Sequence, residues 1–214
     1  MTEYSVNPAR MALVNVDMQI AFVEGTPLSA PDGVALLPVV NRLAEACRQA
    51  AEWRETVMAG RRFTMAVNVS ANEFLEPGLA WEVLRVLRET DLDPTMLRTE
   101  ITESILLDDS SIATEILLEL KRIGVELAID DFGTGYSSLS YLRRLPADIL
   151  KIDRSFVADV DQDEREAAIV EAVVRVAGAL GMRIVAEGIE RIEQAHFLAE
   201  MGCQTGQGYH FARP

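Results

Sequence analysis

Short apolar runs of strand length alternate along this chain with longer segments whose apolar residues recur at helical spacing. Apolar runs bounded by turn residues predict strands, and apolar positions three and four residues apart predict helices. The pattern predicts strands over residues 12–16, 64–70, 97–103, 125–130, 149–153, 183–186 and 208–211. It predicts helices over residues 36–55, 78–90, 112–123, 138–144, 164–180 and 192–201. Three of these helices run into a glycine, a common C-terminal stop signal, at Gly124, Gly181 and Gly202.

The polar residues of this pattern gather at the carboxyl ends of the predicted strands. Five different strands each have one at or near the end: Asn68, Glu100, Asp130, Lys151 and Glu187. Alternating strands and helices imply a mainly parallel sheet, either open and doubly wound or closed into a barrel. A barrel brings its strand ends to one mouth, whereas an open sheet spreads them along a line. We therefore predict one α/β domain over residues 1–214, a (β/α) barrel of TIM type.

Composition narrows the classes of partner. The chain has 34 acidic and 20 basic residues, a formal net charge of −14, which disfavours binding to duplex DNA or RNA and to anionic membranes. A phosphate-bearing ligand is still compatible with this negative charge if divalent metal ions supply positive charge at the binding site. We find no targeting segment, and no apolar stretch approaches the roughly 20 residues that span a bilayer. Cys47 and Cys203 make neither a disulfide framework nor a zinc cluster, so we expect a cytoplasmic location.

The strand-end side chains form an all-oxygen set of candidate metal ligands. Glu100, Asp130, Asp131 and Glu187, with the amide of Asn68, suit hard cations such as Mg²⁺, Mn²⁺ or Ca²⁺. Two such ions about 4 Å apart suit in-line attack on a phosphodiester. Asp130 and Asp131 would face opposite sides of a regular strand, but a turn of the backbone at the strand end lets both reach one site.

Lys151 lies between apolar neighbours in a predicted strand. Inside a barrel it must face carboxylates or a metal-bound water, where it could orient or deprotonate a nucleophile. Plainer alternatives exist, because a single strand-end carboxylate is usually a loop anchor and a lysine between apolar residues usually extends to the surface. The recurrence of such residues at corresponding places on successive strands favours a site.

A glycine-containing loop follows the fourth predicted strand over residues 131–139. Gly133 and Gly135 permit positive φ angles and a close approach to a ligand. The loop matches neither a P-loop nor a dinucleotide-binding fingerprint. The alternative is an ordinary connection between a strand and a helix, with Ser137 or Ser138 as the N-cap.

Six stretches carry most of these residues, in an order and at a spacing that fit one known family. They are Ala66-Val-Asn-Val-Ser70, Glu100-Ile-Thr-Glu-Ser104, Asp130-Asp-Phe-Gly-Thr-Gly-Tyr-Ser-Ser-Leu139, Leu150-Lys-Ile-Asp153, Ala186-Glu-Gly-Ile-Glu190 and Gln207-Gly-Tyr209. Over about residues 45–214 the chain resembles the EAL-domain family of cyclic-di-GMP phosphodiesterases. The resemblance implies a TIM-type barrel and two-metal hydrolysis, with Mg²⁺ or Mn²⁺, of one phosphodiester of cyclic-di-GMP to linear pGpG.

The resemblance also implies roles for individual residues. Asn68, Glu100 and Asp130 resemble ligands of one metal, and Asp130 and Asp131 resemble ligands of the second. Glu187 resembles a catalytic residue near the second metal.

Further implied roles concern water, substrate and the glycine loop. Lys151 resembles the lysine that holds the attacking water. Gln207 resembles a residue at the substrate and metal site, and Gly133 and Thr134 belong to the glycine loop beside it. Glu190 resembles the residue that steadies this loop, which in the family helps to form a dimer interface.

The chain departs from the family near its N-terminus. No Glu-Ala-Leu motif occurs in it, although the family takes its name from this motif and uses its glutamate as a metal ligand. Residues 1–45 instead resemble the start of isochorismatase-like cysteine hydrolases. This likeness rests on Ala12-Leu-Val-Asn-Val-Asp-Met-Gln19, Phe22-Val-Glu-Gly25, Leu37-Pro38 and Asn41-Arg-Leu43. We therefore interpret the chain as a chimera, with residues 46–214 from an EAL-like barrel that is incomplete or has a replaced N-terminal βα unit.

Asp17 ends the first predicted strand and could replace the missing glutamate, although we favour the plainer alternative that it caps a loop. Three functions stay open: a metal-dependent cyclic-di-GMP phosphodiesterase, weakened or inactivated by the missing ligand; a non-catalytic cyclic-di-GMP-binding or interaction module; and a folded chimera without activity. An incomplete barrel exposes strand edges that can pair with another chain, so we expect a homodimer.

Overall fold

A computed structural model describes residues 13–14, 37–56, 58–60, 63–76, 78–103, 105, 111–133 and 142–211. Its centre is a parallel sheet with the strands in chain order. The strands are β1 (Leu13–Val14), β2 (Thr64–Val69), β3 (Leu97–Thr102), β4 (Glu126–Phe132), β5 (Ile149–Ile152), β6 (Arg183–Ala186) and β7 (Thr205–Gly206). Among these described strands no ladder joins β7 to β1. The sheet is therefore an incomplete barrel of TIM type.

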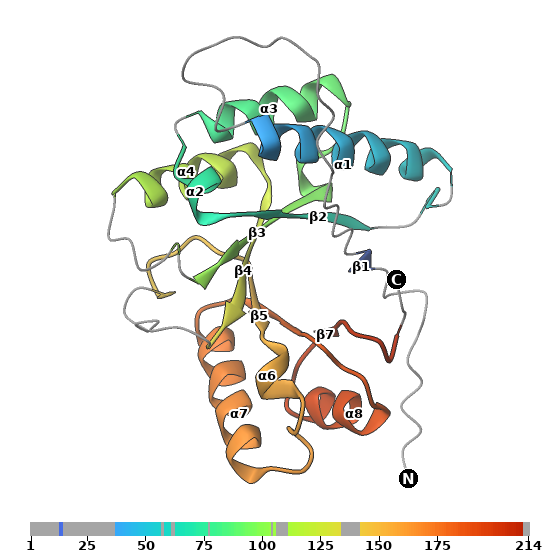
Figure 1. The fold of residues 1–214 in the computed structure, drawn as a ribbon, viewed down its shortest axis with the longest axis vertical. Helices are drawn as coiled ribbons and strands as arrows, with labels where there is room; N and C mark the ends of the chain where they lie inside the picture. The colour runs from blue at the N-terminus through green and yellow to red at the C-terminus, as the bar shows by residue number, and fades with distance from the viewer. Residues whose placement is uncertain are drawn as a thin grey trace.

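Helices cover the outer face of this sheet. They are α1 (Leu37–Glu55), α2 (Ala71–Phe74), α3 (Leu79–Glu89), the 3₁₀ turn η2 (Pro94–Met96), α4 (Ser111–Ile123), α6 (Arg154–Val157), α7 (Glu164–Ala179) and α8 (Ile192–Glu200). Figure 1 shows α1, α3 and α4 grouped at one end of the view and α6, α7 and α8 at the other, with the strands between them. None of the helices in the described part of the chain is long and apolar enough to cross a membrane.

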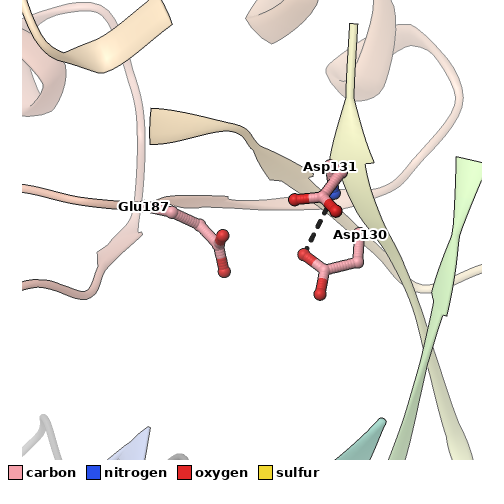
Figure 2. A group of neighbouring side chains, drawn as sticks. All are labelled: Asp130, Asp131 and Glu187. Carbon is pink, nitrogen blue, oxygen red and sulfur yellow. Dashed lines mark hydrogen bonds between the residues drawn. The ribbon is translucent and has the colours of Figure 1, made fainter. Parts of the chain in front are cut away.

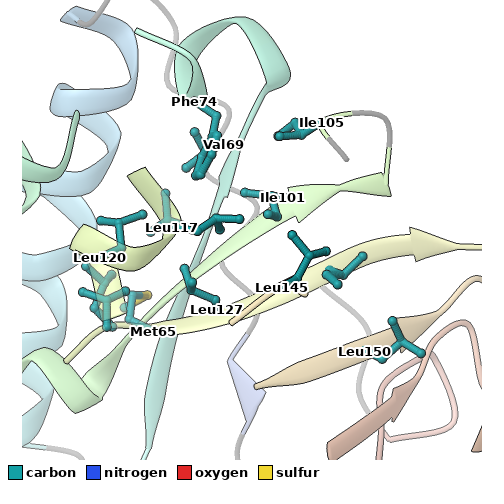
Figure 3. Packing of buried hydrophobic residues seen from close by; sticks show 14 of the residues in the cluster. Met65, Val69, Phe74, Ile101, Ile105, Leu117, Leu120, Leu127, Leu145 and Leu150 are labelled. Atoms are coloured by element: carbon teal, nitrogen blue, oxygen red, sulfur yellow. The ribbon is translucent and has the colours of Figure 1, made fainter. Parts of the chain in front are cut away.

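The main core lies between the sheet and the helices. Successive residues of a strand face opposite sides of a sheet, so Leu97 and Ile101 of β3 pack outward against helical side chains such as Leu117 and Leu120. Figure 3 shows Ile101, Leu117 and Leu120 among the buried residues of this core. Burying each such side chain contributes roughly 2 kcal/mol.

The inner face of the sheet carries little apolar packing. Ala128, Ile149 and Val185 form a separate small cluster there. Below them, near the amino ends of the strands, Glu126 accepts hydrogen bonds from the guanidinium groups of Arg98 and Arg183. Above them, at the carboxyl ends, lie the predicted site residues. The inside of the barrel thus has polar groups at both ends and small apolar side chains between.

The carboxyl end of β2 is fixed by a capped helix. Ser70 is the N-cap of α2, and Glu73 completes a capping box with it. Arg42 of α1 pairs with Glu73 at 2.7 Å and donates to the backbone oxygen of Asn68 at 3.4 Å. These contacts hold Asn68 where β2 ends.

Most predicted elements are confirmed, and one is wrong. The strand expected over residues 208–211 is a turn, and the last strand is β7 at Thr205–Gly206. Gly208 has a φ of 150°, and its carbonyl accepts a hydrogen bond from Phe211 N at 3.0 Å, which closes the turn. Of the strand predicted over 12–16 the structure describes Leu13–Val14, and residues 138–141 of one predicted helix lie outside the described part.

Candidate metal centre

The parallel register brings the predicted residues of neighbouring strands to one end of the barrel. Asn68 of β2 is paired with Glu100 of β3, and Thr102 of β3 is paired with Asp130 of β4. Glu100 is buried, whereas the Asn68 side chain is exposed. Glu187 directly follows β6, and its backbone N–H donates to Ile152 O of β5 at 3.0 Å. Each of these residues therefore lies at or near a strand end, as the sequence predicted.

Lys151 is the centre of the cluster. Its side chain is 1% exposed, and Nζ lies 2.5 Å from Glu100 Oε2, 2.7 Å from Glu187 Oε1 and 2.9 Å from Asp130 Oδ1. An ammonium group has three N–H donors, so these three carboxylates can use all of them. The plainer alternative, that Lys151 extends to the surface, is wrong.

Asp130 and Asp131 reach the same site although they are adjacent in the chain. The pairing of β4 with β5 is irregular between Ile129 and Phe132, and Asp131 has a positive φ of 54°. This bulge cancels the usual alternation of a strand. Carboxylate oxygens of Asp130, Asp131 and Glu187 lie within 4.8 Å of one another, and Figure 2 shows the three side chains together.

Burial, and after it the neighbouring charges, shift the pKa values in this cluster. Burial raises the pKa of Glu187 to about 7, and Lys151 opposes this shift while Asp130 adds to it. Partial burial and the charges of Asp130 and Asp153 raise the pKa of Asp131. Burial alone would lower the pKa of Lys151, but Glu100, Glu187 and Asp130 outweigh it and hold that pKa above its ordinary value. Lys151 is therefore a cation at neutral pH and a poor proton acceptor.

Gln207 joins the cluster from the turn after β7. Its Nε2 donates to Glu187 Oε1 at 3.0 Å, while its backbone N–H donates to Ala186 O at 2.9 Å. The structure thus places Gln207 beside Glu187, and its role at a substrate and metal site stays a prediction.

The glycine loop begins with a contact that the sequence analysis did not assign. The buried carboxylate of Glu103 accepts a hydrogen bond from Gly133 N at 2.7 Å. Gly133 has a φ of 101°, and an added Cβ would lie 2.7 Å from the ring of Phe156, so the loop requires glycine here. Glu103 directly follows β3 and lies in the family-like stretch Glu100-Ile-Thr-Glu-Ser104, and these were the signals in the sequence that could have indicated it.

Three other predicted residues are not placed in the cluster. The carboxylate of Glu190 pairs with Arg154 at 2.8 Å on the surface. Its predicted contact with the glycine loop stays a prediction, because residues 134–141 lie outside the described part of the chain. Thr134 belongs to that segment, and Asp17 also lies outside the described residues.

The donor set fits hard divalent cations. Glu100 Oε1 is buried and has no hydrogen-bond partner, although Oε2 of the same carboxylate is bonded to Lys151. Gln207 Oε1 is also buried without a partner. An unpaired buried oxygen is costly, and a cation that binds it removes the cost. With the carboxylates nearby, these oxygens form the kind of site that Mg²⁺, Mn²⁺ or Ca²⁺ prefers.

Comparison with known proteins assigns the chain to a family. The model of the EAL domain matches residues 40–214. The chain therefore belongs to the EAL domain family. This EAL domain is 45% identical over 172 residues, 80% of the chain, to the bifunctional diguanylate cyclase/cyclic di-GMP phosphodiesterase MucR of Pseudomonas aeruginosa. It is 42% identical over 173 residues, also 80% of the chain, to the cyclic di-GMP phosphodiesterase NbdA of the same organism. The chain spans 25% and 22% of these two relatives.

Solved structures give the same assignment. A complex of PaMucR phosphodiesterase with c-di-GMP matches with a TM-score of 0.78 and 43% identity, covering 85% of this chain and 73% of that one. A manganese and cyclic-di-GMP complex of Klebsiella pneumoniae BlrP1 matches with a TM-score of 0.71 and 31% identity, covering 82% of this chain and 45% of that one.

Proposed function

We propose that this EAL domain binds cyclic-di-GMP and hydrolyses one of its phosphodiester bonds to give linear pGpG, with Mg²⁺ or Mn²⁺ as cofactor. The observation that carries the proposal is the meeting of Glu100, Asp130, Asp131 and Glu187 around Lys151 at the carboxyl end of the barrel. The named phosphodiesterases among its relatives support the substrate.

Asn68, Glu100, Asp130 and Asp131 would hold the divalent ions in this proposal. Such ions neutralise charge on a phosphodiester and lower the pKa of a bound water. The residues of the chain then have distinct tasks. Lys151 would orient the attacking water through an N–H donor that a carboxylate gives up when it binds a metal ion, and it would not remove the proton of that water, because its pKa is raised.

Glu187 and Gln207 would complete the site beside the ions. Glu187 has a pKa of about 7 without metal and is the better candidate for holding a proton during the reaction. Gln207 fixes the carboxylate of Glu187 through their hydrogen bond. Gly133 and Thr134 would border the substrate from the glycine loop, and Glu190 would support that loop.

The missing Glu-Ala-Leu motif favours a second candidate function, binding of cyclic-di-GMP without turnover. The family's metal ligand from that motif has no counterpart in the sequence unless Asp17 replaces it. A lost ligand weakens metal binding, and charge stabilisation by metals is a large part of phosphodiester hydrolysis. A third candidate is a folded chimera that does neither.

We also propose that the chain is a chimera whose N-terminal segment comes from another family. Its support is the start of the family match at residue 40, which leaves residues 1–39, most of the isochorismatase-like stretch, outside the match. Activity of the cysteine-hydrolase type is not proposed, because burial raises the pKa of Cys47 to about 12 and that of Cys203 to about 11. A homodimer, and a cytoplasmic location, remain predictions.

Hydrolysis of cyclic-di-GMP tests the proposal, with Lys151→Ala as the site variant. The matched control is Lys121→Ala, which removes the chain's other lysine. Lys121 pairs with Asp148, just before β5 and thus at the opposite end of the barrel. We expect turnover with Mg²⁺ or Mn²⁺ that falls at least about 100-fold in Lys151→Ala and stays unchanged in Lys121→Ala. Binding of cyclic-di-GMP in Ca²⁺ without turnover in Mn²⁺ would support the second candidate, a binding module. Absence of both binding and turnover would support the third, an inactive chimera.

A further inference from the structure

The ammonium group of Lys151 contacts the same carboxylates that a bound divalent cation would use. Its ammonium group contacts one carboxylate from β3, one from β4 and one from the segment after β6, all within 2.9 Å. Each of its three N–H donors can therefore bind a different carboxylate, Glu100, Asp130 or Glu187. Without Lys151 these side chains would converge with no positive charge among them in the described part of the chain.

The oxygens that Lys151 uses belong to the candidate metal-binding carboxylates. Glu100 offers Oε2 to Lys151 and keeps Oε1 unpaired, and Asp130 offers Oδ1. A divalent ion that binds these carboxylates must therefore share them with an ammonium group or draw them away from it. Both cations also repel each other at the short distances of such a site.

We propose that Lys151 is a resident counter-cation that stabilises the metal-free barrel and at the same time weakens its affinity for divalent metal. The inference rests on the proposed metal site and adds a role to it that is independent of the nucleotide. Removal of the ammonium group leaves the buried carboxylate of Glu100 without its cation and takes the same cation away from the partly buried Asp130 and Glu187, which destabilises the metal-free fold. The same removal lets a divalent ion bind those carboxylates without competition from the ammonium group.

The test compares Lys151→Met with Lys121→Met. Methionine keeps an unbranched chain of similar length and removes the charge. Lys121 also forms a partly buried ion pair, with Asp148 at 2.6 Å, but it lies outside the cluster. The readouts are the melting temperature in a chelator and the Mn²⁺ affinity by calorimetry, both without nucleotide.

We expect Lys151→Met to melt at lower temperature than the parent in chelator and to bind Mn²⁺ about tenfold more tightly. Lys121→Met should bind Mn²⁺ like the parent. A folded Lys151→Met variant with unchanged or weaker Mn²⁺ affinity would overturn the inference.

A second pair of variants covers the case in which Lys151→Met does not fold. Glu187→Gln removes one carboxylate, so Lys151→Met/Glu187→Gln loses one charge of each sign. The double variant should bind Mn²⁺ more tightly than Glu187→Gln alone, and equal or weaker binding would overturn the inference. Because no nucleotide is present, this result is separate from the proposed function, which fails if the parent binds no cyclic-di-GMP in Ca²⁺.

Discussion

At the scale of single residues, Asp131 shows how the site departs from ordinary strand geometry. Its φ of 54° is a left-handed conformation that a residue with a Cβ adopts at a cost of roughly 1 kcal/mol. The departure turns its carboxylate toward Asp130 and Glu187. Like charges that meet in this way oppose folding and favour the binding of a cation.

Asp131→Asn tests this balance. Asparagine tolerates the same backbone conformation, and it removes repulsion from Asp130 and Asp153. We expect the metal-free variant to melt at the same or a higher temperature than the parent and to bind Mn²⁺ about tenfold more weakly. Thermal melting in chelator and calorimetry with Mn²⁺ measure the two effects. A lower melting temperature combined with normal Mn²⁺ affinity would mean that Asp131 has a structural role instead.

Glu187 predicts a pH dependence of the metal-free protein. Its folded pKa of about 7 lies above the ordinary value of 4.5, so folding favours its protonated form. The stability linked to this proton is complete below pH 4.5 and is lost as the pH rises through 7. We expect the parent in chelator to lose stability between pH 6 and about 8, and Glu187→Gln to lose less. Thermal melting at both pH values measures this loss. An equal change of melting temperature with pH in the parent and in Glu187→Gln would refute the assignment.

At the scale of elements, the turn after β7 positions the Glu187 side of the site. Gly208 follows Gln207 and has a φ of 150°. A Cβ there would lie 2.2 Å from Ile189 O and 2.3 Å from Ile189 N, both rigid backbone atoms. The turn and the segment that carries Glu187 are thus packed backbone to backbone.

Gly208→Ala should therefore disturb both stability and the site. We expect a loss of about 2 kcal/mol or more of unfolding free energy and weaker Mn²⁺ binding. Gly178→Ala is the control, because an added Cβ in that helical position meets nothing within 4 Å. The control should be neutral or stabilise α7 by about 0.5 kcal/mol. Denaturant unfolding of both variants provides the comparison, and equal stability would contradict the packing described.

The same elements explain what sequence could and could not predict. Strand β5 is a short apolar run around Lys151, and Glu100 lies between the core residues Leu97 and Ile101 of β3, near the end of that strand, so both polar positions were predictable. The short helices α2 and α6 depend on caps at Ser70 and Asp153 and carry too few residues for a periodic signal. The sequence alone could not assign Glu103, because its partner is a backbone N–H in a distant loop.

At the scale of the whole molecule, the sheet is open between its two outer strands in the described part of the chain. Open edges present unpaired backbone groups and invite a second chain. We therefore expect a homodimer, measured by light scattering coupled to size-exclusion chromatography at several concentrations. The net charge of −14 opposes association of two copies, so the dimer fraction should rise with salt. A single monomeric species at all concentrations and salts would contradict the expectation.

In the proposed site, carboxylates from separate strands share a bound divalent ion at the mouth of the barrel. A crystal of the protein soaked in Mn²⁺, measured for anomalous scattering, tests it most directly. We expect an anomalous peak within bonding distance of Glu100 and Asp130 and beside Asn68. A well-ordered map that shows these side chains and no peak among them would contradict it.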